Sequence, residues 1–353
     1  MDTAGVATHR RLDTQVARER FALEAAASDA ALAASPDGAQ GWVTIAGHHL
    51  RLRVAGRELT DRVPGAFAQV RRHATSGGAL TLDVDVWDEA GARVGPPDVE
   101  VWDRARSADG RFFEHATPHV VSWLDRASHR LVARVRSARG LSPGSLFQPF
   151  SGLLAVWLAD RGTPAIHAGA VARDGRAVIV AGSSGAGKST VTLSCLAAGF
   201  DYLGDDFVVL SSPEGGTPHT VHAVYGTAHL DRDHLARFSA LDRATEVPAL
   251  PDGNKVVLRI ADRFPDGFTL AARVQAIVLP RLAPGSPTLL RQAPKSAALL
   301  AMIPSSLFIR SSATPAAFRA LAGLVEAVPA YWLEMGTDLS AIPRALVRLW
   351  PGA

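Results

Sequence analysis

The chain is poor in several features that define whole classes of protein. Among its 353 residues there is a single cysteine, Cys195, which excludes an intramolecular disulfide framework and fits a reducing compartment. No apolar stretch is long enough to cross a bilayer, and the N-terminus is charged and alanine-rich where a secretory signal would be apolar. We therefore expect a cytoplasmic protein without a membrane span.

Basic blocks and metal-ligand patterns are also lacking. The formal net charge is +3, and the chain has only three lysines, Lys188, Lys255 and Lys295, while its arginines are spread along its length. Because no dense basic block is present, nucleic-acid binding is not expected. The 12 histidines show no ligand-like spacing with cysteines or carboxylates, which argues against a structural zinc site.

One short stretch carries a specific chemical signal. Residues 181–190 read AGSSGAGKST and satisfy the pattern G-x-x-x-x-G-K-[ST], between an apolar, strand-like run and a helical stretch. In such a loop, backbone N–H groups and the N-terminus of the next helix face a polyphosphate. The alternative is a plain glycine- and serine-rich turn. The predicted phosphate-binding residues are Gly182, Ser183, Ser184, Gly185, Ala186, Gly187, Lys188, Ser189 and Thr190.

Two of these residues have expected roles of their own. Lys188 is expected to reach the β- and γ-phosphates of a nucleotide, and the Ser189 hydroxyl is expected to ligate Mg²⁺. The motif therefore predicts a nucleotide with at least three phosphates, together with Mg²⁺.

The acidic residues after the loop stand in an unusual order. Most P-loop NTPases place an aspartate at the end of an apolar strand, but here Asp205 and Asp206 precede the apolar run 207–210. The other core-strand pattern, 274–282, ends in a proline and an arginine and offers no carboxylate. This order weakens an interpretation as an ordinary ATPase or GTPase. Neighbouring residues on a strand point to opposite faces, so both carboxylates reach one site only at an irregular strand start, which Gly204 favours.

A histidine lies upstream of the loop. Residues 163–182 read as two short strands joined by a tight turn at Arg173-Asp174-Gly175, a pattern typical of a hairpin. We expect His167 on the first of these strands, close to where the second strand delivers the phosphate-binding loop. A buried histidine with a purely structural role is the alternative.

Taken in order, these features resemble a known family. Residues 164–210 are similar to the catalytic domain of bacterial HPr kinase/phosphorylase, and closer still to the wider HPr-kinase-like group, which includes the kinases of lasso-peptide precursors. A histidine in a hairpin, a P-loop, a helix and an Asp-Asp pair before the next strand recur here at compatible spacing. The similarity continues more loosely to about residue 349. It implies an ATP- and Mg²⁺-dependent kinase acting on a serine-type hydroxyl.

The resemblance implies roles for the matching residues. One of Asp205 and Asp206 would act as general base on the acceptor hydroxyl, and the other would help to hold Mg²⁺. We expect Ser189 and Asp205 at the metal, but this division of labour between the two carboxylates stays open. His167 would lie near the transferred phosphate or orient a carboxylate. Lys255 could supply a second positive charge or be an exposed turn lysine.

The phosphate acceptor is less well defined. The glycine-rich signature and basic loop that true HPr kinases carry downstream of the Asp pair are missing. We therefore expect a peptide or protein acceptor, such as a precursor peptide, with a small-molecule hydroxyl as an alternative. A nucleotide-binding regulatory or scaffold protein with vestigial catalysis is a second alternative. The reverse, phosphorolytic or hydrolytic, reaction also stays open.

Length and patterning predict two domains after an N-terminal arm. Residues 1–40 form either one amphipathic helix or a partly disordered arm, and residues 41–143 form a β-rich domain that serves substrate recognition or packing. Residues 144–353 form the catalytic domain. The expected fold class is α/β with α+β mixed sheets, and the resemblance implies a P-loop domain of the HPr kinase/PEP carboxykinase-like type. A homo-oligomer is compatible with this organisation.

Overall fold

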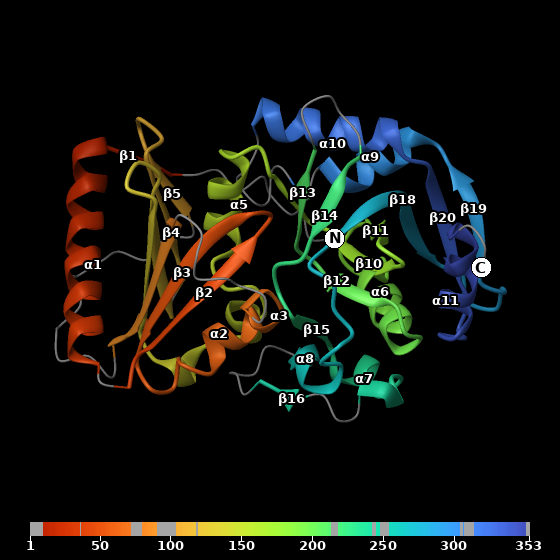
Figure 1. Cartoon of the computed structure of the whole chain (residues 1–353), viewed down its shortest axis with the longest axis horizontal. Helices are drawn as coiled ribbons and strands as arrows, with labels where there is room; N and C mark the ends of the chain where they lie inside the picture. Colours follow the sequence, from red (N-terminus) through yellow and green to blue (C-terminus); the bar gives the residue numbers. More distant parts are fainter. Residues whose placement is uncertain are drawn as a thin grey trace.

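The fold consists of two large mixed sheets and a small three-stranded sheet, with helices packed around them (Figure 1). The computed structural model describes residues 10–35, 37–71, 80–89, 104–117, 119–212, 218–241, 245–247, 254–303, 306 and 314–350. The predicted class, α/β with mixed sheets, is confirmed at this level. No helix in these ranges is both long and apolar enough to cross a membrane.

The N-terminal sheet has eight strands in the order β1–β5–β6–β7–β8–β4–β3–β2. Its alternating sequence explains its two faces, because Val84 and Val86 point into the core while Asp83 and Asp85 pair with arginines on the other face. The strands are β1 (Arg10–Leu12), β2 (Ala39–Ile45), β3 (His48–Ala55), β4 (Leu80–Asp88), β5 (Arg104–Ser107), β6 (Phe112–Ala116), β7 (Val120–Asp125) and β8 (Arg130–Val135).

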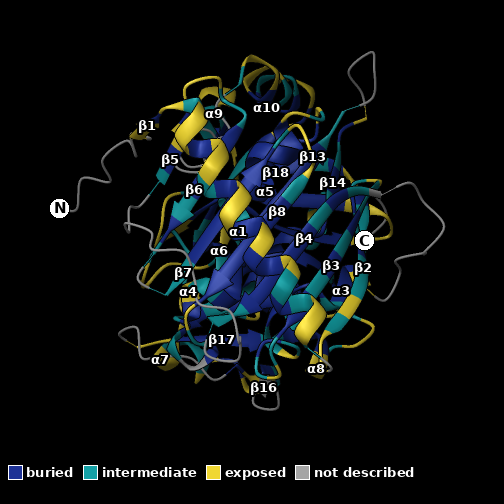
Figure 2. Ribbon diagram, turned by 90° about the vertical axis from the view of Figure 1, so that its left-hand side faces the viewer, coloured by how far each residue is buried: buried dark blue, intermediate teal, exposed yellow. Residues whose placement is uncertain are grey.

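A long helix, α1 (Thr14–Ala34), covers the outer face of this sheet (Figure 2). It begins at a capping aspartate, Asp13, whose side chain accepts hydrogen bonds from two backbone N–H groups of the first turn. Ion pairs fix it to the sheet, among them Glu24 with Arg134, both almost fully buried. Of the two alternatives for residues 1–40, the structure has the helix over residues 14–34, and it is packed against the sheet.

Short helices join the N-terminal sheet to the rest of the chain. These are α2 (Arg62–Ala66), α3 (Ala68–Arg71), α4 (Pro143–Phe147) and α5 (Ser151–Ala159). One apolar cluster runs from the inner face of the N-terminal sheet through α5 to the second sheet. The side-chain amide of Gln69 also donates to the backbone carbonyls of Leu203 and Tyr225. The two predicted domains therefore share a core.

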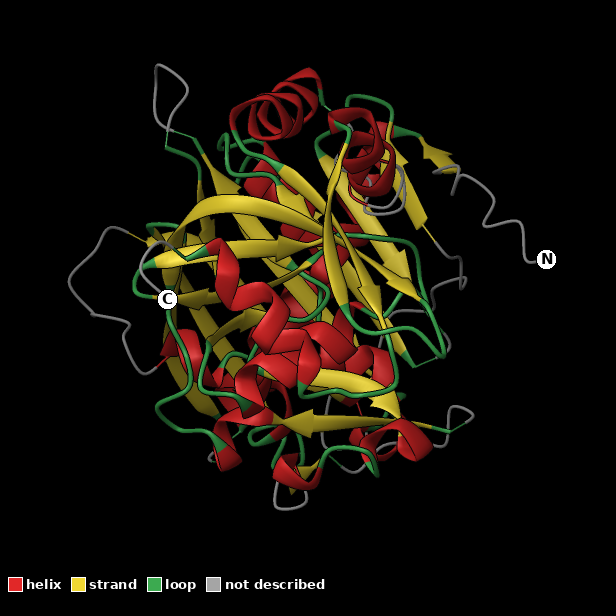
Figure 3. Cartoon of the chain, turned by 90° about the vertical axis from the view of Figure 1, so that its right-hand side faces the viewer, coloured by secondary structure: helices red, strands yellow, loops and turns green. Residues whose placement is uncertain are grey.

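The second sheet is built around β18 (Ala271–Leu282), which pairs in parallel with β11 and β20 and antiparallel with β14. Figure 3 shows it with helices packed against it. Its other strands are β9 (Ala165–Ile166), β10 (Gly169–Arg173), β11 (Arg176–Val180), β12 (Asp201–Gly204), β13 (Val208–Ser211), β14 (Thr220–His222), β19 (Leu289–Ala293) and β20 (Ala330–Met335). Its helices are α6 (Lys188–Ala197), α9 (Lys295–Ile303), α10 (Pro315–Ala327) and α11 (Ala341–Leu346).

The small sheet lies beside α6 and has the order β15–β17–β16. Its strands are β15 (Thr227–Asp231), β16 (Thr245–Glu246) and β17 (Lys255–Arg259), with the short helices α7 (Arg232–Leu235) and α8 (Ile260–Arg263). The turn predicted before Lys255 falls largely on residues 251–253, which lie outside the described residues. Lys255 itself opens β17.

The predicted hairpin is present, with one difference that matters for the site. Strands β10 and β11 pair across the turn Asp174-Gly175, whose φ angles of 53° and 70° are those of a two-residue hairpin turn. His167, however, does not lie on the first hairpin strand as expected; it lies in a bend between β9 and β10. The bend arises because β9 pairs with β13 whereas β10 pairs with β12.

These two pairs are halves of one interrupted antiparallel ladder. Ile166 lies opposite Val208 on one side of the interruption, and Ala170 lies opposite Gly204 on the other. Residues 167–169 and 205–207, which do not pair in this ladder, therefore lie opposite each other. Gly169 is required here, since a Cβ at this position would lie 2.6 Å from Cγ2 of Thr192. The interruption brings the histidine bend and the acidic pair together.

Candidate active site

The loop between β11 and α6 has the backbone that a phosphate-binding loop needs. Ala181 still belongs to the sheet, because its N–H donates to the Val278 carbonyl at 2.9 Å. Gly185 and Gly187 have φ angles of 78° and 102°, which residues with a Cβ rarely adopt. A Cβ on Gly187 would also lie 2.5 Å from Cε of Met335. The chain then enters α6, whose N-terminal end lines a cavity.

Lys188 is the first residue of α6, and its side chain folds back over the loop. Its ammonium donates to the carbonyl oxygens of Gly182 and Ser183 at 3.1 and 3.3 Å and lies 3.6 Å from Oδ1 of Asp206. The side chain is only 7% exposed. A buried ammonium needs anionic or carbonyl partners, so the lysine is fixed where its charge faces both the loop and the acidic pair.

Asp205 is buried, at 3% exposure, beneath the first turn of α6. Its Oδ1 accepts a hydrogen bond from the Thr192 hydroxyl at 3.1 Å, and the Ser189 hydroxyl also bonds to this carboxylate. Its Oδ2 is buried and has no hydrogen-bond partner within the described parts of the chain. Burial, reinforced by the negative charge of Asp206, raises the pKa of Asp205 to about 7.

Asp206 is more accessible than Asp205 and contacts different groups. Its side chain is 28% exposed, and Oδ1 contacts Nε2 of His167 as well as Lys188. The His167 backbone N–H donates to the Ser306 hydroxyl at 3.0 Å, which anchors the bend. Because Nε2 faces a carboxylate, we assign the ring proton to this nitrogen. The irregular strand start that the sequence analysis required for both aspartates is therefore present, since residues 205–207 lie between β12 and β13.

One cavity of about 490 Å³ brings these groups together. Among the predicted site residues, it is lined by Ser184, Gly185, Gly187, Lys188, Ser189, Thr190, Asp205, Asp206 and His167. Gly182, Ser183 and Ala186 belong to the same loop but do not line the cavity in this structure. Lys255 does line it, from the start of β17.

Sequence reasoning missed the side chains that β15, α7 and the turn after α7 contribute. Asp231, His234 and Arg237 line the same cavity, and Nε2 of His234 lies 3.3 Å from the Thr190 hydroxyl. These residues belong to the run DRDHLAR, residues 231–237, which begins at the last residue of β15. A charged cluster at the end of a strand is a weak signal, because most such clusters are solvated turns. The position of this cluster beside the loop depends on the pairing of β15 with β17, a strand that follows more than 20 residues later in the sequence.

The described residues contain no group of three or more histidine, cysteine or carboxylate side chains arranged to hold a metal ion. The two expected metal ligands, the Ser189 hydroxyl and the Asp205 carboxylate, lie beside each other. Cys195 is fully buried in α6, and burial raises the pKa of its thiol far above the ordinary value, so it is not a nucleophile.

The raised pKa of Asp205 predicts a pH-dependent stability. Below pH 4 this carboxyl is protonated in both the folded and the unfolded chain, whereas above pH 7 the folded protein must hold a buried charge. Stability is therefore lost as the pH rises from about 4 to about 7. We expect Asp205→Asn to be more stable than the unchanged protein in metal-free buffer at pH 8, with the gain in melting temperature widening over that window.

Thermal unfolding followed by circular dichroism at several pH values measures this gain. The exposed carboxylate Asp266, replaced in the same way, controls for the removal of one carboxylate from the surface. A pH-independent effect of Asp205→Asn would show that Asp205 stays ionised when buried.

None of the protein-family models compared with the chain matches it, and no curated protein gives a significant match. What bears on the function is therefore the set of groups in the cavity. These are a buried lysine on a glycine-rich loop, two carboxylates in different surroundings and a histidine in contact with one of them.

Proposed function

We propose that this protein is an ATP- and Mg²⁺-dependent kinase of the HPr-kinase-like type, which transfers the γ-phosphoryl group to a serine-type hydroxyl of a peptide or protein. The observation that carries the proposal is the position of Asp206. Its carboxylate contacts Nε2 of His167 and lies 3.6 Å from the ammonium of Lys188, on the wall of the loop cavity. A base is thus held beside the group that would bind the transferred phosphate.

Phosphoryl transfer depends on positioning and charge neutralisation. The loop backbone and the N-terminal end of α6 would bind the triphosphate, and Lys188 would exchange its contacts with the loop carbonyls for contacts with the β- and γ-phosphates. Lys255 and Arg237 add positive charge at the cavity wall. The three cationic side chains suit a strongly anionic ligand.

Ser189 and Asp205 are the residues that would hold Mg²⁺. The fit rests on Asp205, whose Oδ2 is buried without a hydrogen-bond partner among the described residues and whose neighbour is the Ser189 hydroxyl. Magnesium prefers oxygen ligands and usually takes only one or two from the protein. When bound, the metal supplies charge neutralisation for the phosphates, and it removes the cost of burying the ionised Asp205.

Asp206 would act as the general base. As the acceptor hydroxyl oxygen bonds to the γ-phosphorus, its proton passes to Asp206 and the bond between the γ-phosphorus and the β,γ-bridging oxygen breaks, which releases ADP. His167 donates from Nε2 to the carboxylate and so fixes its orientation. In this assignment the buried carboxylate of the pair serves the metal and the accessible one serves the acceptor.

The acceptor proposal is tested by supplying hydroxyl substrates directly. We expect mass spectrometry of candidate peptides incubated with the protein, ATP and Mg²⁺ to show the addition of one phosphate on a serine. Peptide precursors encoded beside the gene are the first candidates, and free serine and sugars test the small-molecule alternative. ATP binding without transfer to any of them would instead favour the regulatory alternative.

A further inference from the structure

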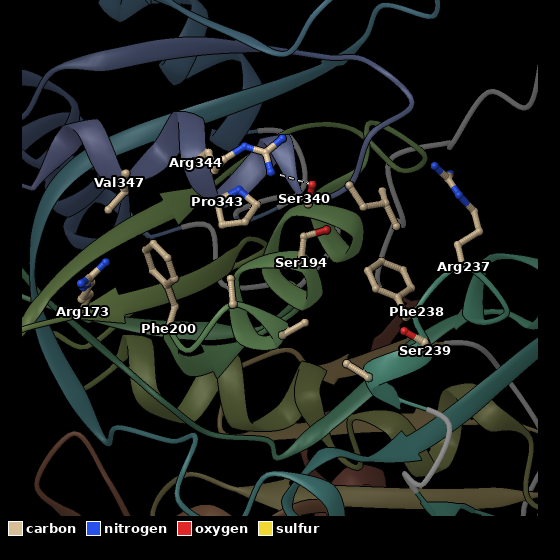
Figure 4. A pocket seen from close by; sticks show the side chains of 14 residues that line it. Arg173, Ser194, Phe200, Arg237, Phe238, Ser239, Ser340, Pro343, Arg344 and Val347 are labelled. Carbon is tan, nitrogen blue, oxygen red and sulfur yellow. Dashed lines mark hydrogen bonds between the residues drawn. The ribbon is translucent and has the colours of Figure 1, made fainter. Parts of the chain in front are cut away.

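The structure has cavities besides the loop cavity. One, of about 550 Å³, shares Arg237 and Leu339 with the loop cavity and is an extension of it (Figure 4). Another, of about 260 Å³, shares no described residue with these two and lies between the N-terminal sheet and the segment 141–151. We call it the N-terminal cavity. Its walls come from α2, β6, β7, β8 and α4 and from the residues that flank α4.

The wall of the N-terminal cavity is uncharged. Among the described residues, no lysine, arginine, aspartate or glutamate lines it. Several of its hydroxyl groups already have partners, since Ser122 donates to the His115 carbonyl at 3.1 Å and Ser142 bonds to the Ser145 hydroxyl at 3.1 Å. Its apolar side chains are Val63, Val120, Val135, Leu141, Pro149 and Phe150. Such a wall suits one apolar side chain, because it would not balance the charge of a phosphate and its volume is small for a free ligand.

One short segment separates the N-terminal cavity from the loop cavity. Phe147 lines the loop cavity, whereas the next three residues, 148–150, line the N-terminal cavity. The Phe147 ring packs against the ring of His229 on β15, with 5.0 Å between the ring centroids, and His229 also lines the loop cavity. The Thr227 hydroxyl of the same strand donates to the Phe147 carbonyl. The segment is therefore a thin wall between the two cavities, fixed on its inner side by β15.

The backbone of this segment is strained at Phe150. Its φ and ψ angles are 61° and 14°, in the left-handed region that residues with a large side chain rarely adopt. The preceding residue is held by the core, because the buried Tyr225 hydroxyl donates to the Pro149 carbonyl at 2.7 Å. Strain of this kind persists where the surroundings hold a binding surface in one shape. Here it holds Phe150 at the wall of the N-terminal cavity.

We propose that the N-terminal cavity binds an apolar side chain of the acceptor peptide, a few residues from the serine that lies beside Asp206. This inference rests on the proposed function and names the part of the acceptor that the protein recognises. Because one segment separates the two cavities, an extended peptide that passes over it reaches both. Binding at a distance from the reacting hydroxyl then supplies specificity and positions the serine.

The test uses short synthetic peptides as acceptors. Each peptide has one serine in an alanine and glycine background, and one leucine placed about two to six residues away on either side, a span of roughly 7 to 20 Å. With the full chain, ATP and Mg²⁺, we expect one separation to lower KM about tenfold or more relative to the peptide without leucine. Aspartate in place of that leucine should remove the gain.

Two variants locate this preference in the N-terminal cavity. Gly144 is exposed in the first turn of α4 and lines the cavity, and the nearest neighbour of a Cβ there is the Ser142 hydroxyl oxygen at 3.9 Å. Gly144→Phe should fill the cavity and raise the KM of the leucine peptide to within about twofold of that of the peptide without leucine. Val120→Glu places a carboxylate in the wall, so a lysine peptide should become a better acceptor than the leucine peptide.

Ala316→Phe is the matched control for Gly144→Phe. Both residues follow a proline in the first turn of a helix with a hydroxyl side chain as N-cap, but Ala316 is exposed on α10 and lines neither cavity. It should keep the leucine preference. The inference is wrong, and the proposed kinase stands, if the unchanged protein phosphorylates the peptides without regard to leucine, or if the preference persists in Gly144→Phe and Val120→Glu. If none of the peptides is phosphorylated, the peptide acceptor of the proposed function fails and this inference fails with it.

Discussion

Replacing Lys188 with alanine should remove phosphate transfer while leaving the fold intact. The ammonium is the only described cationic group in hydrogen-bond contact with the loop carbonyls, and it lies 3.6 Å from Asp206. Without it, the charge of the β- and γ-phosphates would face the acidic pair uncompensated. We expect kcat/KM to fall by two to three orders of magnitude, on the order of the loss seen when a preorganised charge-stabilising donor is removed.

The stability of the Lys188→Ala variant should change far less than its activity. Lys188 contacts the Asp206 carboxylate but makes no contact that fixes a core element, so its melting temperature should change little. Lys295→Ala is the matched control, since this lysine pairs with Glu326 on the surface, away from the loop cavity. Normal turnover of Lys188→Ala, measured by phosphate transfer or ATP consumption, would refute the assignment of the loop as the nucleotide site.

Asp206→Asn should have the second large effect, and it should differ in kind from Asp205→Asn. An amide at position 206 can still accept a hydrogen bond from His167 but cannot take a proton. We expect kcat to fall by about two to four orders of magnitude with ATP binding retained, and no metal concentration should restore it. Steady-state kinetics with a phosphorylated peptide as product measures the loss.

Asp205→Asn should lose activity because it coordinates Mg²⁺ more weakly. Because weakened coordination is offset by mass action, its activity should recover in part at high Mg²⁺ or Mn²⁺. Each of the two variants serves as the control for the other, since the residues are adjacent and both substitutions replace aspartate with asparagine. Equal defects that are both rescued by metal would refute the role of Asp206 as base and leave two metal ligands.

Local patterns predicted the elements that contribute the central groups of the site. The glycine spacing of residues 182–187 requires a tight loop, and the Asp174-Gly175 pair requires a two-residue turn, so both follow from short-range geometry. Gly204 before the acidic pair likewise predicted an irregular strand start, which the structure has between β12 and β13. These features depend on residues a few positions apart.

What could not be predicted depends on pairing between distant segments. His167 was placed on the wrong element because nothing in residues 163–173 shows that the first two strand residues pair with β13 and the rest with β12. Asp231, His234 and Arg237 were missed because β15 is directed toward the loop by β17, about 25 residues later in the chain. The parallel neighbours of β18, which assemble the second sheet, are likewise separated by long stretches of sequence.

The central position of β18 has a consequence for synthesis on the ribosome. This strand completes the ladder of β11 only about 100 residues after β11 has been made, and β20 joins it about 50 residues later still. Until then, the strand groups β12–β10–β11 and β14–β13–β9, which β18 joins, are not connected into one sheet against which α5 and the inner face of the N-terminal sheet could pack. Nascent chains of this protein should therefore expose apolar surface between the completion of the N-terminal sheet and the synthesis of β18, and we expect chaperones to bind them during that interval.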